Sequence, residues 1–120
     1  MAENLSKHFN EKGFVIAENL LQNSEILDYR KALNRAVKQR KKLDKRVFSE
    51  KTEYEQSFIQ CQNLWEDFKN IRKLTFDQRI AGTAAKLLGV KKLRLWHDQA
   101  LIKESGGRET DTHHDQPYWP

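Results

Sequence analysis

Apolar residues recur at helical intervals in two stretches of the chain, and capping residues flank both stretches. The first stretch predicts a helix over residues 25–42, after the good N-cap residues Asn23 and Ser24. Its apolar face consists of Ile26, Tyr29, Leu33, Ala36 and Val37. The second stretch predicts a helix over residues 78–88, capped by Asp77 and ended by Gly89. Its expected buried stripe consists of Ile80, Ala84, Leu87 and Leu88.

Shorter patterns lie before and between these helices. Residues 14–17 are β-prone and predict a brief strand, whereas the polar residues 44–52 predict a loop. Residues 54–68 again carry apolar side chains at near-helical intervals, which indicates a further helical stretch. These side chains are Tyr54, Phe58, either Ile59 or Cys61, and Trp65.

From Val90 the pattern changes to a rough alternation that is typical of a strand. One side of this strand would carry Leu93, Leu95, His97, Gln99 and Leu101. Residues 104–109 contain two glycines and predict a turn, after which residues 112–116 predict a second strand. We therefore expect one α+β domain over residues 1–120, helical to about residue 89 and built of strands from about residue 90.

Composition fits a single small domain that does not enter a membrane. The chain has 120 residues, 38% apolar and 32% charged, and no apolar run approaches the length of a membrane span. The N-terminus lacks the apolar core of a signal peptide. Cys61 is the only cysteine, so an intrachain disulfide is impossible and a cytoplasmic location is expected.

Positive charge is concentrated in residues 30–46, which contain nine Lys or Arg residues and one acid, Asp44. A nucleic-acid-binding helix is one interpretation of this segment. We favour a solvated helix face, because no aromatic residues interleave with the charges to stack on bases. No nucleic-acid partner is therefore expected.

The candidate chemistry lies near the end of the chain, in the sequence THHDQPYWP. On a strand, side chains two residues apart share a face, so His113 and Asp115 would point together and His114 away from them. An imidazole and a carboxylate suit Fe(II), although the 2-His-1-carboxylate triad needs a second histidine. His97 is a less favoured ligand, and a zinc site or a solvated polar strand are the other interpretations.

Three segments, FIQCQNLWEDF, LLGVKKLRLWHDQALIKESGG and HHDQPYWP, occur in this order and together resemble the phytanoyl-CoA dioxygenase family. These enzymes are Fe(II)- and 2-oxoglutarate-dependent oxygenases with a double-stranded β-helix, a jelly-roll or cupin-like fold. The resemblance runs from about Gly13 to Pro120 and implies that His113 and Asp115 are iron ligands. Halogenating relatives carry a small residue in place of the carboxylate, so Asp115 favours hydroxylation.

The resemblance also implies contacts to the cosubstrate 2-oxoglutarate from Gln99, from His114 and from Gln60 or Gln62. Tyr118 and Trp119 would line the substrate side, for a small metabolite or an acyl-CoA ester. The family's second histidine ligand, its basic carboxylate clasp and about half of its β-helix are absent. We therefore expect the N-terminal part of such an enzyme, nearly inactive alone. The alternative is a non-catalytic or degenerate module with a vestigial half-site; the oligomeric state is left open.

Overall fold

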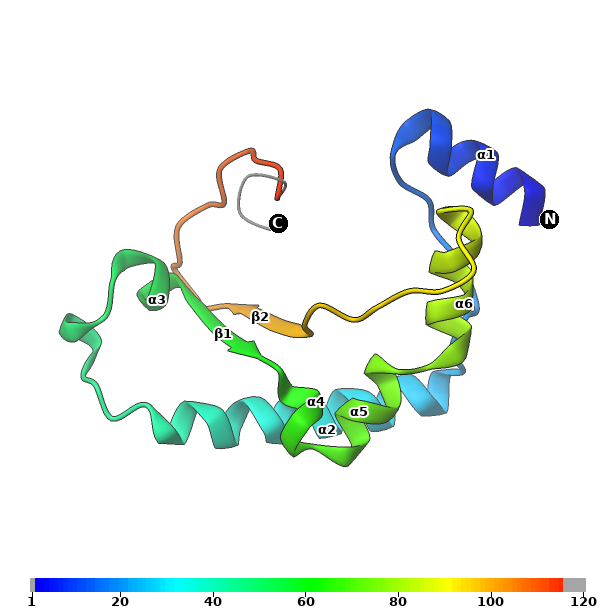
Figure 1. Ribbon diagram of the computed structural model, residues 1–120. Helices are drawn as coiled ribbons and strands as arrows, with labels where there is room; N and C mark the ends of the chain where they lie inside the picture. Colours follow the sequence, from blue (N-terminus) through cyan, green and yellow to red (C-terminus); the bar gives the residue numbers. More distant parts are fainter. Residues whose placement is uncertain (1, 116–120) are drawn as a thin grey trace.

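The computed structural model describes residues 2–115 and combines several helices with one small antiparallel sheet (Figure 1). The helices are α1 (Ala2–Lys12), α2 (Asn23–Leu43), the 3-10 helix η1 (Phe48–Glu50), α3 (Glu53–Ser57), α4 (Leu64–Asp67), α5 (Lys69–Thr75) and α6 (Gln78–Leu87). The strands are β1 (Phe58–Gln62) and β2 (Gln99–Lys103). This mixture fits the expected α+β class. Among the described residues, none of the helices combines the length and the apolar character that a membrane span requires.

The two strands pair antiparallel, from Phe58 opposite Lys103 to Gln62 opposite Gln99. Because side chains alternate along a strand and paired residues share a face, the sheet has two distinct faces. One face packs into the core and carries Ile59, Cys61, Ala100 and Ile102. The opposite face carries Phe58, Gln60, Gln99 and Leu101.

Helix α2 lies along the core face of the sheet and also contacts α5. Small side chains make this approach possible, since Ala32 and Ala36 of α2 are buried and Ala36 is 0% exposed. Leu64 and Ile71, from α4 and α5, complete the buried cluster. The sheet is therefore fixed from one side, and its other face is left open.

Both predicted long helices are confirmed, with small differences at their ends. Helix α2 begins two residues earlier than expected, and the Glu25 carboxylate accepts a hydrogen bond from the Gln22 backbone N–H at 2.8 Å. Asp77 caps α6 by accepting from the Arg79 N–H at 2.8 Å, and Gly89 follows the helix with a left-handed φ of 66°.

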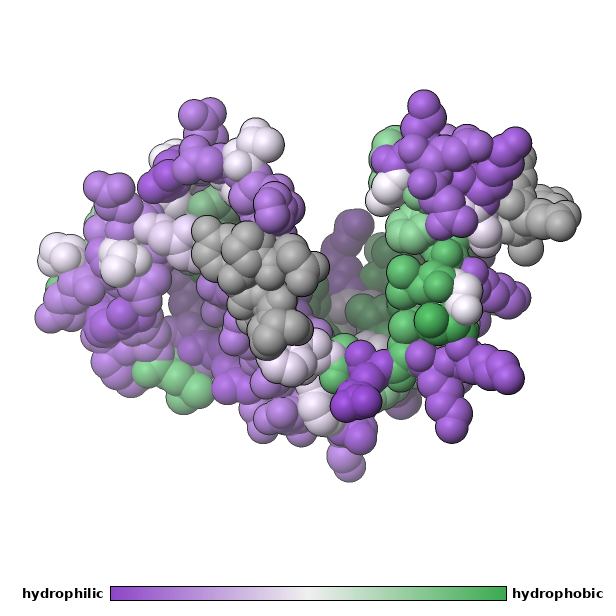
Figure 2. Space-filling model, turned by 45° about the horizontal axis from the view of Figure 1, so that its top comes forward, coloured by the Kyte–Doolittle hydropathy of each residue, from purple (hydrophilic) through white to green (hydrophobic). Residues whose placement is uncertain are grey.

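The predicted buried stripe of α6 is wrong. No residue of α6 is buried, and Leu88, just beyond its end, is 56% exposed. The physical reason is that α6 packs mainly against α1, at a distance from the sheet, so its apolar side lacks a large partner among the described residues. Figure 2 shows this flank as an apolar surface beside a hollow.

The near-helical spacing in residues 54–68 is also misleading. The chain forms a short helix, a strand and another short helix there, because Phe58–Gln62 pairs with β2. Pairing decides the conformation of such short apolar runs more than their spacing does. Asn63 then takes a left-handed φ of 53° and ends the strand.

Three strand predictions are wholly or partly wrong within the described residues. Residues 14–17 form no strand, residues 90–98 form none before β2, and residues 112–115 form none after it. A strand needs a hydrogen-bonding neighbour, and β1 offers only five residues, all of which pair with β2. The predicted turn is confirmed at Ser105–Gly106, where Gly107 N–H donates to Glu104 O at 3.0 Å.

Part of the basic segment forms ion pairs within the chain. Arg40 pairs with Asp67, and Lys41 Nζ lies 2.7 Å from Glu104 Oε1. Arg46 contacts Asp44 at 2.9 Å and Glu55 at 2.8 Å. These positive charges therefore link α2 and its following loop to neighbouring elements.

Candidate functional site

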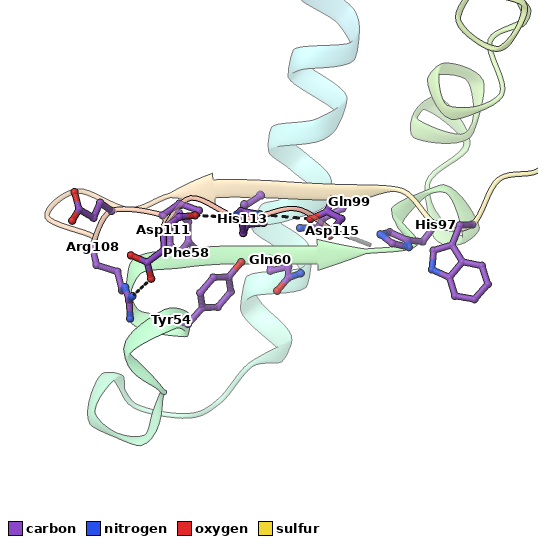
Figure 3. Close-up of a pocket in the computed structure, with 13 residues that line it drawn as sticks. Tyr54, Phe58, Gln60, His97, Gln99, Arg108, Asp111, His113 and Asp115 are labelled. Carbon is purple, nitrogen blue, oxygen red and sulfur yellow. Dashed lines mark hydrogen bonds and ion pairs between the residues drawn. The ribbon is translucent and has the colours of Figure 1, made fainter. Parts of the chain in front are cut away.

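A cavity of about 1170 Å³ lies over the open face of the sheet (Figure 3). The strands contribute Phe58, Gln60, Gln99 and Leu101. Aromatic side chains of Tyr54 and Trp96 also line it, and the Tyr54 and Phe58 rings lie 5.0 Å apart. The cavity thus combines apolar walls with a few amide groups, a composition typical of small-molecule sites.

The segment after β2 turns back over this face (Figures 1 and 3), and several of its residues line the cavity. Arg108, Asp111, His113 and Asp115 of this segment all line the cavity. Their side chains therefore face the same space as Gln60 and Gln99, although the two groups come from different parts of the chain.

The structure brings His113 and Asp115 together. His113 Nε2 lies 3.6 Å from Asp115 Oδ1, and both side chains are substantially exposed. His113 Nδ1 lies 2.7 Å from the backbone oxygen of Asp111. Because a carbonyl oxygen can only accept, Nδ1 is the donor in this contact, which leaves the Nε2 lone pair of a neutral ring available to a metal.

The described residues offer two metal donors at this place but not three. Among residues 2–115, no group of three or more His, Cys, Asp or Glu side chains is close enough to hold a metal ion. His97 lines the same cavity without completing such a group. One imidazole nitrogen and one carboxylate oxygen match the donor types that Fe(II) accepts, but they form only part of a coordination sphere.

The structure describes four of the expected cosubstrate residues. Gln60 and Gln99 line the cavity. A smaller depression beside α2 is lined by both Gln60 and Gln62, and Gln62 is not among the residues that line the cavity. His114 is exposed and is not among the residues that line the cavity. Tyr118 and Trp119 lie outside the described residues. Of the two glutamines considered on β1, only Gln60 lines the cavity.

Cys61 lies on the core face of the sheet, away from the cavity. Burial raises the pKa of its thiol above the ordinary value, which disfavours the thiolate. Cys61 is accordingly not among the residues that line the cavity.

Sequence patterns did not single out Arg108, Asp111 and Asp98. The first two come within five residues of His113. Arg108 Nη2 donates a hydrogen bond to Asp111 Oδ2 at 3.1 Å. Asp98 accepts hydrogen bonds from Leu64 N–H at 2.8 Å and Trp65 N–H at 3.1 Å, so it fixes the start of β2 to α4. The signal that could have pointed to them is their position in the sequence, since Arg108 and Asp111 lie close to His113 and Asp98 directly precedes Gln99.

Residues 9–120 match the model of the family described as phytanoyl-CoA dioxygenase (PhyH). The match covers nearly the whole chain, including His113 and Asp115. Neither the curated proteins nor the solved structures gave a significant match.

Proposed function

This chain belongs to the phytanoyl-CoA dioxygenase family, and we propose that it supplies two iron ligands of an Fe(II)- and 2-oxoglutarate-dependent hydroxylase. The observation that carries the proposal is the pairing of His113 and Asp115, 3.6 Å apart, at a cavity that Gln60 and Gln99 also line. We further propose that β1 and β2 belong to a double-stranded β-helix, the finer fold that the family implies.

His113 Nε2 and an oxygen of Asp115 would hold the metal. The Nδ1 contact to the Asp111 carbonyl orients the imidazole, as outer partners of metal-bound histidines commonly do. Fe(II) together with 2-oxoglutarate supplies the oxidising chemistry that hydroxylates an unactivated C–H bond. Asp115 favours this outcome over halogenation, since its carboxylate would occupy the position on the metal that a halide would need.

Gln60 and Gln99 would orient the cosubstrate. Their amide N–H groups can donate to its carboxylate oxygens, while their amide oxygens can accept. Phe58 and Leu101 supply apolar surface around these amides, which strengthens polar contacts by excluding water. His114 is a weaker candidate for this role because it does not line the cavity.

The proposed partner is a small-molecule substrate, either an acyl-CoA ester or a small metabolite. Tyr54, Phe58 and Trp96 give the cavity aromatic surface that can pack against the apolar part of such a molecule. A cytoplasmic location is proposed with it, on the basis of a single buried cysteine.

A non-catalytic module with a vestigial half-site is the second candidate. It is favoured by one observation, the lack of a third donor beside His113 and Asp115 among residues 2–115. Both candidates predict weak metal binding by this chain. They differ in whether 2-oxoglutarate strengthens that binding, because a working site holds metal and cosubstrate together.

The deciding experiment is a titration with Mn(II), an oxygen-stable substitute for Fe(II), followed by NMR with and without 2-oxoglutarate. The proposal expects paramagnetic broadening at His113 and Asp115, at lower Mn(II) concentrations when 2-oxoglutarate is present. His8 on α1 is an internal control and should keep its signal. Broadening that 2-oxoglutarate does not change would favour the non-catalytic module, and no selective broadening would contradict both candidates.

A further inference from the structure

We propose that Ser57 and Gly107 are positioning residues that hold the segment of His113 and Asp115 over the sheet. The inference rests on the proposed function, since it assigns these two residues a purpose in the same site. Neither residue lies at the cavity described above. Their importance comes from the turn that connects β2 to residues 108–115.

Ser57 is the last residue of α3 and the only buried polar residue among those described, with 6% of its surface exposed. Its hydroxyl donates to Glu53 O at 2.9 Å and accepts from Arg108 N–H at 3.1 Å. Its backbone oxygen accepts from Glu104 N–H at 2.8 Å. Ser57 therefore bonds to the backbone at both ends of the turn formed by residues 104–108.

Gly107 packs against the same serine so closely that no side chain fits. A Cβ at Gly107 would lie 2.7 Å from Ser57 O and 3.1 Å from Glu104 O. Both atoms belong to the backbone, so neither can rotate away to make room. Only a glycine allows this approach without moving the turn.

The other side of the turn is fixed to α2. Lys41 Nζ contacts the Glu104 carboxylate at 2.7 Å, while the Glu104 N–H is bonded to Ser57. The turn is thus held between two elements that themselves pack on the sheet. This arrangement sets the direction in which the chain leaves β2.

A continuous series of contacts leads from the turn to the metal-binding pair. Arg108, whose N–H is bonded to Ser57, donates from its guanidinium to Asp111 Oδ2 at 3.1 Å. The backbone oxygen of Asp111 then contacts His113 Nδ1 at 2.7 Å, and His113 Nε2 faces Asp115. A substitution at Ser57 or Gly107 that weakens the contacts of the turn should therefore displace His113 indirectly, through this series of contacts.

The test compares two variants with matched controls in the 120-residue chain. Ser57→Ala removes the hydroxyl, and Ser105→Ala removes an exposed hydroxyl from the same turn. Gly107→Ala inserts a Cβ against the backbone, whereas Gly82→Ala inserts one where nothing lies within 4 Å. Ser57→Ala is the milder change and decides the question alone if Gly107→Ala does not fold.

The first measurement uses no metal. Amide hydrogen exchange at Arg108 should become about ten-fold faster in Ser57→Ala, because its N–H loses its acceptor. The His113 and Asp115 NMR signals should shift in Ser57→Ala and Gly107→Ala but stay in place in both controls. Signals of His113 and Asp115 that remain at their original positions in the two test variants would overturn the proposal.

The second measurement is Mn(II) affinity, followed by broadening of the His113 signal. We expect about a ten-fold loss in Ser57→Ala and a larger loss in Gly107→Ala. A purely structural role would lower the melting temperature without changing the affinity of the folded chain, and that result would also overturn the proposal. If the unaltered chain binds no Mn(II) at His113, the proposed function fails, whereas the metal-free shifts still decide the positioning roles.

Discussion

His113 Nε2 and Asp115 Oδ1 lie 3.6 Å apart on a segment that is not a strand. The proximity of these two side chains was expected because side chains alternate along a strand. In the structure they lie close together although residues 112–115 pair with no other strand among the described residues. The contact between His113 Nδ1 and Asp111 O orients the imidazole instead. Local contacts and the preceding turn, and not a sheet, therefore bring His113 and Asp115 together.

Replacing Asp115 tests whether this pair binds metal. Asp115→Ala should weaken Mn(II) binding by about ten-fold or more, because it removes one of two donors. Calorimetry or electron paramagnetic resonance measures the affinity. Glu109→Ala, an exposed acid that lines the same cavity, is the matched control and should change the affinity little. Equal affinity in Asp115→Ala and the unaltered chain would exclude Asp115 as a ligand.

The 120-residue chain should have little or no turnover by itself. Two donors hold Fe(II) weakly, and the described residues provide no third donor beside them. Succinate formation from 2-oxoglutarate, measured in the presence of Fe(II) and oxygen, checks this expectation. A His113→Ala variant sets the background of the assay. Robust succinate production that this variant abolishes would show that the chain contains a complete site.

Acid should destabilise the fold through Asp77 and Glu55. The hydrogen bond from Arg79 lowers the pKa of Asp77 from 3.8 to about 2, and the hydrogen bond from Arg46 lowers the pKa of Glu55 from 4.5 to about 2. Because folding lowers each pKa, the carboxylates contribute full stability above about pH 4.5 and lose it as the pH falls toward 2.

Thermal unfolding followed by circular dichroism between pH 2 and pH 6 measures this acid dependence. Asp77→Asn and Glu55→Gln cannot ionise, so each should flatten the fall in melting temperature below about pH 4. Glu66→Gln, at an exposed position on α4, is the control. An acid dependence that is the same in all three variants would rule out these two carboxylates as its source.

Asp98 should contribute strongly to stability. Its carboxylate accepts from two backbone N–H groups of α4 and from the Thr75 hydroxyl, at 3.0 Å in the last case. Asp98→Ala leaves these donors without their acceptor and should lower the free energy of unfolding by about 1–3 kcal/mol. Urea unfolding measures the change, and Thr75→Val should cost less because it removes only one of these hydrogen bonds.

The two long helices could be predicted from the sequence because their signals are local. Asp77 and Gly89 mark the ends of α6 through capping and left-handed geometry, which need no distant partner. Strand β1 could not be predicted in the same way. Its pairing with β2 joins residues about forty positions apart, and Phe58, Cys61 and Trp65 happen to repeat at helical spacing.

The candidate site shows the same division between local and distant signals. His113 and Asp115 are two residues apart, so their proximity could be predicted. Gln60 and Gln99 line the same cavity because β1 pairs with β2, and only the family resemblance pointed to them in advance. The role of Ser57 could not be predicted, because it depends on hydrogen bonds to residues about fifty positions later. No pattern in one segment encodes such a contact.

Alanine side chains between α2 and the sheet limit how these two elements can shift relative to each other. A side chain without rotatable bonds cannot take up a new rotamer, so Ala36 and Ala100 cannot absorb a relative shift of helix and sheet. At these two positions a shift of α2 against the sheet would have to be taken up by backbone movement. We expect an incoming molecule to be accommodated on the other face of the sheet, by exposed side chains such as Tyr54 and Trp96 and by residues 108–115, whose polar contacts can break and re-form individually.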